Sequence, residues 1–146
     1  MNTAFITKTE VTTVESGHYG RLLVARIMPN DDLVQALQTL CQKNQIRRAV
    51  IRSVVGSLIE ANLAYGPANA ERVITVTGPG VEILSVSGEI CEFENGYWRA
   101  ALSGVVADTR GQVFAGKIME GRNRSFITIE ASIQEWLVDS TTGDST

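Results

Sequence analysis

The chain has 146 residues, of which 44% are apolar and 20% charged, and its formal net charge is −3. This is the size and composition of one globular domain that buries its own core without disulfide or metal cross-links. Its mildly acidic balance excludes the usual strongly basic kind of nucleic-acid-binding protein, so DNA binding would need a local basic patch.

No apolar run approaches the roughly 20 residues of a membrane-spanning helix, and the N-terminus lacks the charged and apolar blocks of a signal peptide. We therefore expect a cytoplasmic protein with no membrane partner. Two isolated cysteines, Cys41 and Cys91, do not make a disulfide framework. We expect both to be reduced thiols that act as small buried apolar groups.

The first two strands are expected over residues 4–14 and 20–28, with a turn from Gly17 to Gly20 between them. Apolar side chains of the second strand point to both of its faces. This pattern predicts a strand inside a sheet that is covered on both sides.

A helix is expected over residues 31–44. Asn30 is the predicted N-cap, and Asp31 and Asp32 in the first turn suit the positive end of the helix dipole. Asn44 is expected to end the helix in the left-handed conformation. The apolar side chains of one face recur at helical spacing, and they are Leu33, Ala36, Leu37, Leu40 and Cys41.

The rest of the chain reads as antiparallel strands. A break is expected at Gly56, between the first two of these strands. Asn95-Gly96 is a strong signal for a hairpin turn. In the last strand, Ile127, Ile129, Ala131 and Ile133 are expected on one face. The predicted strands cover residues 46–55, 57–64, 72–77, 81–93, 97–107, 112–119 and 125–133.

The predicted fold class is α/β (α+β), a mostly antiparallel sheet with one main helix packed on it. We expect one domain over residues 1–137. Residues 138–146 are small and polar, which is typical of a disordered tail.

Four segments, in this order, carry a resemblance to a known family. Residues 31–58 hold the helix, its following strand and a glycine turn, and residues 81–90 (VEILSVSGEI) hold a long central strand. Residues 105–118 (VVADTRGQVFAGKI) hold two strands around an aspartate-glycine turn, and residues 126–133 (FITIEASI) a closing strand. Over residues 18–136 the chain resembles the plant-and-prokaryote-conserved (PPC) domain family.

The resemblance implies a homotrimer. Plant members of the family accompany an AT-hook in nuclear proteins that bind AT-rich DNA, whereas bacterial members are usually the domain alone. No AT-hook core (Arg-Gly-Arg-Pro) occurs in this chain. The DNA binding that the family implies would therefore not be of the plant type.

The chain departs from the family at three positions. Many bacterial members carry His-x-His before the aspartate turn and Gly-Gly-His after it, which suits a zinc site. Counted from Asp108, these histidines fall on Ala101, Ser103 and Lys117. The only histidine in the chain is His18, so we expect no metal and no cofactor.

The same positions define a candidate pocket between subunits. A buried lysine can act as a base or hold an anion, and a Ser–Lys pair can activate a nucleophile. The alternative is that Lys117 is a solvated or interface residue that pairs with Glu82, Glu89 or Glu120. The candidate pocket residues are Ala101, Ser103 and Lys117, with Arg99, Glu82 and Asp108.

Arginines offer candidate contacts to nucleic acid, although acidic residues are scattered between them. A trimer would repeat each patch three times, which multiplies a modest attraction to phosphates. The candidates are Arg47, Arg48, Arg52, Arg110, Arg122 and Arg124.

We expect a non-catalytic, trimerising PPC-type module that binds or associates with DNA. The alternative is a small-molecule (anion) binding protein or an enzyme, with a site between subunits and the family zinc site lost. Trp98 and Trp136 are expected in the core or at the subunit interface. Four apolar residues are expected to pack between subunits, and they are Val105, Val113, Phe114 and Ile118.

Overall fold

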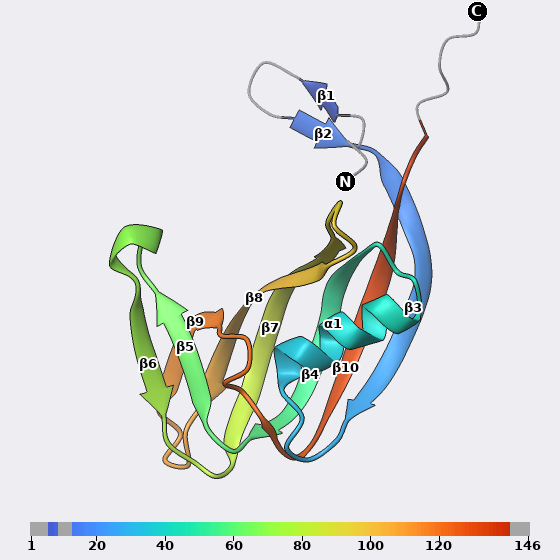
Figure 1. Ribbon diagram of the computed structural model, residues 1–146. Helices are drawn as coiled ribbons and strands as arrows, with labels where there is room; N and C mark the ends of the chain where they lie inside the picture. The colour runs from blue at the N-terminus through green and yellow to red at the C-terminus, as the bar shows by residue number, and fades with distance from the viewer. Residues whose placement is uncertain (1–5, 9–12, 141–146) are drawn as a thin grey trace, which may run out of the picture.

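The computed structural model describes residues 6–8 and 13–140. Ten strands, one α-helix and one short 3₁₀ helix follow one another along these residues (Figure 1). They are β1 (Ile6–Lys8), β2 (Thr13–Glu15), β3 (Gly17–Ile27), α1 (Leu33–Lys43), β4 (Arg48–Leu58), β5 (Ala61–Tyr65), η1 (Ala68–Ala70), β6 (Arg72–Val76), β7 (Val81–Glu92), β8 (Trp98–Ala107), β9 (Val113–Ile118) and β10 (Ser125–Val138).

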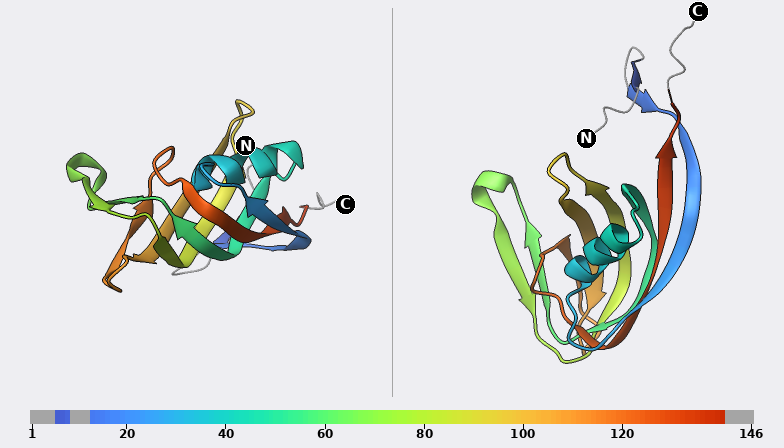
Figure 2. Two further views of the ribbon diagram at one scale, coloured as in Figure 1. Left: turned by 90° about the horizontal axis from the view of Figure 1, so that it is seen from below. Right: turned by 45° about the vertical axis from the view of Figure 1, so that its right-hand side comes forward.

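Eight strands form one sheet in the order β3-β10-β4-β7-β8-β9-β5-β6, and its neighbouring strands are antiparallel. The sheet curves around α1, which lies against its concave face (Figures 1 and 2). The predicted class, a mostly antiparallel sheet with one main helix, is confirmed. The convex side of the sheet, which we call the outer face, carries no helix in the described part of the chain.

Helix α1 is capped by Asp32, whose Oδ2 accepts a hydrogen bond from the backbone N–H of Gln35 (3.0 Å). The prediction that Asn30 is the N-cap is wrong, because Asn30 has a φ of 70° and lies in a left-handed turn before the helix. The prediction for Asn44 is also wrong. Asn44 is the C-cap with a φ of −94°, and Gln45 adopts the left-handed conformation at 53°.

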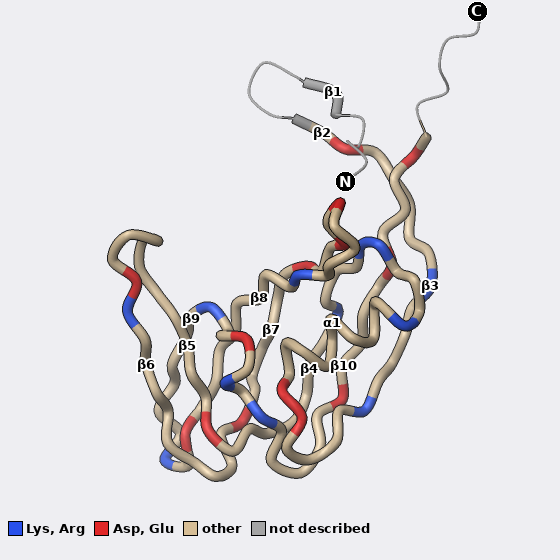
Figure 3. The backbone as a smooth tube through the Cα atoms, in the orientation of Figure 1, with Lys and Arg blue, Asp and Glu red and all other residues tan. Residues whose placement is uncertain are grey.

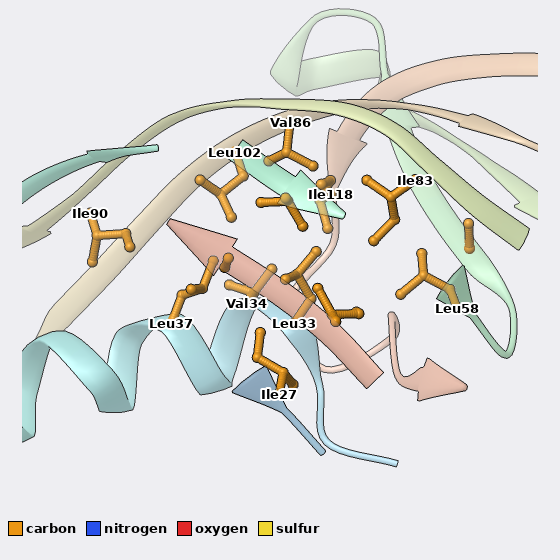
Figure 4. Close-up of a cluster of buried hydrophobic side chains, with 14 of the residues drawn as sticks. Ile27, Leu33, Val34, Leu37, Leu58, Ile83, Val86, Ile90, Leu102 and Ile118 are labelled. Carbon is orange, nitrogen blue, oxygen red and sulfur yellow. The ribbon is translucent and has the colours of Figure 1, made fainter. Parts of the chain in front are cut away.

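The hydrophobic core fills the space between α1 and the concave face of the sheet (Figure 4). Leu33 and Leu37 of α1 are fully buried against side chains such as Ile90 of β7 and Leu102 of β8. Full burial of one such side chain stabilises the fold by about 1.5–3 kcal/mol. The helix and the sheet therefore depend on each other for stability.

Strand β3 lies at one edge of the sheet, so the prediction of a strand covered on both sides is wrong. One of its faces packs on the core through Ile27, whereas Leu22 and Val24 on the other face are 58% and 71% exposed. The predicted strand over residues 4–14 is also wrong. Its described parts are β1 and β2, which pair with each other.

Strand β4 continues through Gly56, where a break was predicted. Gly56 has a φ of 143°, and a Cβ there would lie 2.5 Å from the carbonyl oxygen of Thr128. Glycine therefore lets β4 pass close to β10 without ending the strand. The prediction that Ile127 shares a face with Ile129, Ala131 and Ile133 is wrong. Ile127 is 63% exposed, whereas the other three are buried. The register of β10 against β4 shifts between Ser125 and Ile129, which interrupts the alternation.

A buried polar cluster joins the start of α1 to β5 and β10. Asp32 Oδ1 accepts from the backbone N–H of Asn123 (2.8 Å), and Asn123 Oδ1 accepts from that of Asn62 (2.8 Å). The Asn123 amide nitrogen donates to the carbonyls of Met119 (2.8 Å) and Asn62 (3.1 Å). Asn123 is wholly buried, so these bonds replace water at a junction of three segments.

At the C-terminal end, β10 reaches Val138, and Asp139 accepts a hydrogen bond from Ser16 Oγ (2.6 Å). Residues 141–146 of the predicted tail lie outside the described residues. Among the described residues, no helix has the length and apolar character needed to cross a membrane.

Candidate functional site

The outer face brings together three polar side chains from neighbouring strands. Ser103 of β8 is paired with Ser87 of β7 on one side and with Lys117 of β9 on the other. Cβ atoms of residues directly opposite each other lie about 4.5–5.5 Å apart. Ser85, two residues before Ser87 on the same exposed side of β7, adds a third hydroxyl.

These four residues line a shallow concavity of about 350 Å³. Apolar side chains such as Val105 and Ala115, with Tyr65, whose ring is apolar but which carries a hydroxyl, form the rest of its wall. We call Ser85, Ser87, Ser103 and Lys117, with this wall, the Lys117 pocket. The structure thus joins the two predicted polar residues, Ser103 and Lys117, in one site.

Ser85 and Ser87 were not predicted as site residues. The signal for them is in the sequence, because serines two apart on a strand share a face. Which face they share, and which serine of β8 lies beside them, depends on the register between β7 and β8. That register includes a shift between Ile83 and Ser85, which the sequence does not reveal.

Lys117 is exposed, and no hydrogen bond or ion pair joins it to the described residues. The predicted pairing with Glu82, Glu89 or Glu120 is therefore absent from the single chain. Glu89 instead accepts from Arg48 (3.2 Å). Its side chain is also not buried, and it lies at the rim of the pocket as a hydrogen-bond donor.

The other predicted pocket residues have different surroundings. Ala101 pairs with Glu89 along the sheet, and Glu82 pairs with Ala107 near the end of β7. Neither of these two predicted residues lines the Lys117 pocket.

Arg99 and Asp108 have local roles. The Arg99 guanidinium lies over the ring of Phe93, 5.4 Å from its centroid. Asp108 Oδ1 accepts from the backbone N–H groups of Arg110 (2.9 Å) and Gln112 (2.8 Å), which stabilises the turn between β8 and β9. These contacts account for both residues without a ligand.

The first group of candidate arginines is largely occupied by contacts within the chain. Arg48 pairs with Glu15 and Glu89, and Arg47 lies 3.6 Å from Glu92. Arg52 lies over the ring of Tyr19, 5.7 Å from its centroid. The tube in Figure 3 shows acidic and basic positions interspersed along the sheet.

The second group differs, because Arg110, Arg122 and Arg124 are exposed and have no ion pair among the described residues. Arg122 and Arg124 line a second concavity, of about 330 Å³, together with Glu60 and Asn62. The six arginines therefore do not form one basic face.

Neither cysteine has the character of a nucleophile. Burial raises the pKa of the Cys41 thiol to about 12, with a smaller contribution from Cys91. Burial and then Glu89 raise the pKa of Cys91. Both are free thiols, as predicted, but only Cys41 is fully buried, whereas Cys91 is half-buried. At neutral pH both are protonated.

The outer face also exposes large apolar side chains on several strands. Val55 of β4 lies one position from the Gly56–Ile83 pair, which sets it beside Leu84 of β7. Such side chains occur on β3, β4, β7 and β9, and Leu84 and Val113 are near neighbours in sequence of the pocket residues Ser85 and Ala115. We call them the outer apolar set: Leu22 (58% exposed), Val24 (71%), Val55 (65%), Leu84 (54%) and Val113 (60%).

Two of the four residues predicted between subunits belong instead to the core side of the sheet. Ile118 is buried in the core and Phe114 packs against it, because alternate residues of β9 face α1. Val113 and Val105 lie on the outer side, as their alternation with Phe114 and Val106 requires. Trp98 packs against the core and donates to the Ile46 carbonyl (2.7 Å), as expected of a core tryptophan.

The model of the Plants and Prokaryotes Conserved (PCC) domain matches residues 14–137. The chain belongs to this family. It is the PPC family to which the sequence segments pointed, and the match spans β3 to β10.

Solved structures agree with this assignment. A PPC protein from Pyrococcus horikoshii superposes with a TM-score of 0.73 at 20% identity, covering 86% of this chain and 83% of its own. A metal-containing protein from Archaeoglobus fulgidus has a TM-score of 0.73 at 19% identity, covering 87% of each chain. A "putative DNA-binding protein" from Bacteroides thetaiotaomicron has a TM-score of 0.67 at 19% identity, covering 82% of each.

A curated relative is the bifunctional protein GlmU of a Synechococcus strain, 31% identical over 96 residues, or 66% of this chain. The chain spans only 14% of the length of that protein. The PPC unit is thus similar to a small part of a much longer protein.

The residues of this PPC domain do not fit the metal that the family implies. The three positions hold a methyl group, a hydroxyl and an ammonium group, where zinc prefers imidazole, thiolate or carboxylate ligands. Among residues 6–8 and 13–140, no group of three or more His, Cys, Asp or Glu side chains could hold a metal ion. We derive no chemistry through a metal at this site.

Proposed function

We propose that this protein is a non-catalytic PPC module that assembles as a homotrimer through the outer face of its sheet. The observation that supports this most is the outer apolar set, whose five members are each more than half exposed on one side of the sheet. Large apolar side chains exposed on one face mark interaction surfaces, and here those of β3 and β4 are separated by polar residues of β10, which include Ser132 and Glu130. The number of subunits, three, rests on the family.

The unpaired edges of the sheet also support assembly. β3 and β6 are its terminal strands, and neither has a second neighbour among the described strands. Long unpaired edges tend to pair with other chains unless they are protected. Assembly would cover the outer face and protect such edges together.

Val55→Glu tests this proposal by placing a charge in the centre of the outer apolar set. We expect the mass in solution, measured by light scattering, to fall from three chains to one, because a buried carboxylate at an interface is costly. Tyr97→Glu is the matched control, since Tyr97 is also an exposed large apolar residue but lies at the β7–β8 hairpin. An unchanged mass for Val55→Glu would rule out this interface.

Association with DNA is the second candidate. Two structures similar to this one, from Bacteroides thetaiotaomicron and Ralstonia eutropha, are each named "putative DNA-binding protein". The exposed Arg122 and Arg124, which have no ion pair in the described part of the chain, are the best contacts for phosphates. A trimer would present six of them.

A gel shift with duplex DNA at low salt tests this candidate, because phosphate attraction is then strongest. We expect the double variant Arg122→Ala, Arg124→Ala to weaken binding. The control is Arg26→Ala, Arg47→Ala, which removes the same charge from residues already close to Glu130 and Glu92. No detectable binding by the native chain, or equal losses in both variants, would count against it.

The small-anion alternative is supported by different residues. Lys117 and the serines beside it have no polar partners within the described chain, and they share one concavity.

A further inference from the structure

We propose that the Lys117 pocket binds the carboxylate group of a small organic acid with a short apolar body. This inference deepens the small-anion alternative: one chain supplies every residue of the pocket, which lies on the outer face and would border the subunit interface of the proposed trimer. It rests on the chemistry of the lining, on the rigidity of the strands that carry it, and on its shape.

The polar lining has one positive charge, the hydroxyls of three serines and of Tyr65, and no carboxylate. Lys117 supplies three ammonium donors, and Ser85, Ser87 and Ser103 each supply a hydroxyl that can donate. None of these four head groups has a hydrogen bond or ion pair within the described residues. One ammonium group and several hydroxyls that can donate, with no carboxylate beside them, suit a bound oxyanion.

The strands hold these groups in fixed positions. Ser103 of β8 is paired with Ser87 of β7 on one side and with Lys117 of β9 on the other, so the sheet fixes the backbones of these three residues relative to one another. Serine has a single short side-chain torsion before its hydroxyl, so little freedom is lost when a ligand binds. The pocket is therefore formed before the ligand arrives.

The amount of charge favours a carboxylate over a phosphate. Phosphate groups are typically held by arginine forks, by free backbone N–H groups or by a helix N-terminus. The pocket has no arginine, and it lies on strands whose backbone groups take part in the sheet ladder. One ammonium group matches one negative charge.

The apolar wall explains why the ligand should be more than the carboxylate. Tyr65, Val105 and Ala115 line the pocket beside the polar groups, and its volume is about 350 Å³. Volumes of roughly 300 Å³ and above accommodate small organic ligands. A short aliphatic or aromatic body would cover these apolar groups while its carboxylate faces Lys117.

An NMR titration of the full chain, labelled with ¹⁵N, tests the proposal with benzoate as the probe. We expect saturable shifts in the amide signals of Ser85, Ser103 and Lys117. Benzamide, which has the same shape without the charge, and inorganic phosphate should give none that saturate. Lys117→Met should weaken benzoate binding about tenfold or more, the loss expected for a charged hydrogen-bond partner.

Lys43→Met is the matched control, because Lys43 is an exposed lysine in the last turn of α1, and it should bind benzoate like the native chain. Ser103→Ala is a second test, since it keeps the charge and should still weaken binding. The mass of each variant is measured alongside, which separates loss of binding from loss of assembly.

Three results would each overturn the proposal. The first is no saturable shift up to about 50 mM benzoate, well above the millimolar range of weak specific binding. The second is equal binding of benzamide, or tighter binding of phosphate. The third is native affinity in both Lys117→Met and Ser103→Ala.

Discussion

Asn123 shows how one buried side chain can hold a junction together. Its amide accepts from the Asn62 N–H and donates to two carbonyls, while its own N–H donates to Asp32. Ser125, two residues later, is equally buried, but its hydroxyl has no partner among the described residues. The contribution of a buried polar residue to stability therefore depends on its hydrogen-bond partners and not on burial alone.

This difference predicts opposite outcomes for two alanine substitutions. Asn123→Ala should lower the free energy of unfolding by about 2–4 kcal/mol, because it removes the acceptor of the Asn62 N–H and the donor to the Met119 carbonyl, while the Asn62 carbonyl keeps its bond from the Met119 N–H. Ser125→Ala should change it by less than about 1 kcal/mol, or stabilise the fold, because an unpaired hydroxyl is removed. Urea denaturation measures both. Equal losses would contradict the assignment of these bonds.

The pairing of Glu135 with Arg21 should make the stability of the fold depend on pH. Its side chain is 11% exposed and accepts from the Arg21 Nε (3.2 Å) and backbone N–H (3.1 Å). The hydrogen bond from the Arg21 side chain holds the pKa of Glu135 below its ordinary value of 4.5. The folded state therefore favours the ionised form.

A group with a lowered folded-state pKa stabilises the fold above its unfolded pKa, and this contribution is lost as the pH falls through the folded value. Glu135→Gln should therefore reduce stability at neutral pH and flatten the loss of stability below about pH 4.5. Glu130→Gln is the control, since Glu130 pairs with Arg26 at the exposed surface. Parallel pH profiles for Glu135→Gln and the native chain, followed by circular dichroism, would refute this role.

At the scale of elements, the sequence identified α1 and most strands but not how they end. Asn30, Asp31 and Asp32 are all good capping residue types, and composition does not distinguish them. The choice falls on Asp32 because its second oxygen also binds the N–H of Asn123, a contact 91 residues away in the chain. Long-range contacts of this kind are not visible in local patterns.

The N-cap is itself testable. Asp32→Ala should destabilise the fold by about 2–3 kcal/mol, since it removes the cap of α1 and leaves the Asn123 N–H buried without an acceptor. Asn30→Gly should stay within about 0.5 kcal/mol of the native chain, because glycine adopts the left-handed conformation of Asn30 freely. Thermal unfolding of both variants checks this. A larger loss for Asn30→Gly would contradict the assignment.

Strand β3 illustrates a second limit of sequence reasoning. Apolar residues on both faces predicted an interior strand, yet β3 is an edge strand with Leu22 and Val24 exposed. The pattern does not distinguish a strand inside one sheet from a strand whose outer side another chain would cover. If another copy of the chain covers the outer face, the same residues are buried by assembly and not by folding.

At the scale of the whole molecule, the order of the four family-like segments along the chain was enough to predict the fold class and the PPC family. It was not enough to predict which polar residues meet. Ser103 and Lys117 were predicted correctly as neighbours, whereas Arg99, Glu82 and Asp108 lie elsewhere. The reason is that a site on a sheet depends on register, and a shift such as that in β7 changes which side chains share a face.

The central claim is that the outer face of this sheet is a subunit interface. Sedimentation equilibrium of the native chain over a series of dilutions into the low micromolar range tests it most directly. A chain of 15.8 kDa that forms a trimer should give three times that mass, about 47 kDa. A mass of 15.8 kDa at every concentration would contradict the account.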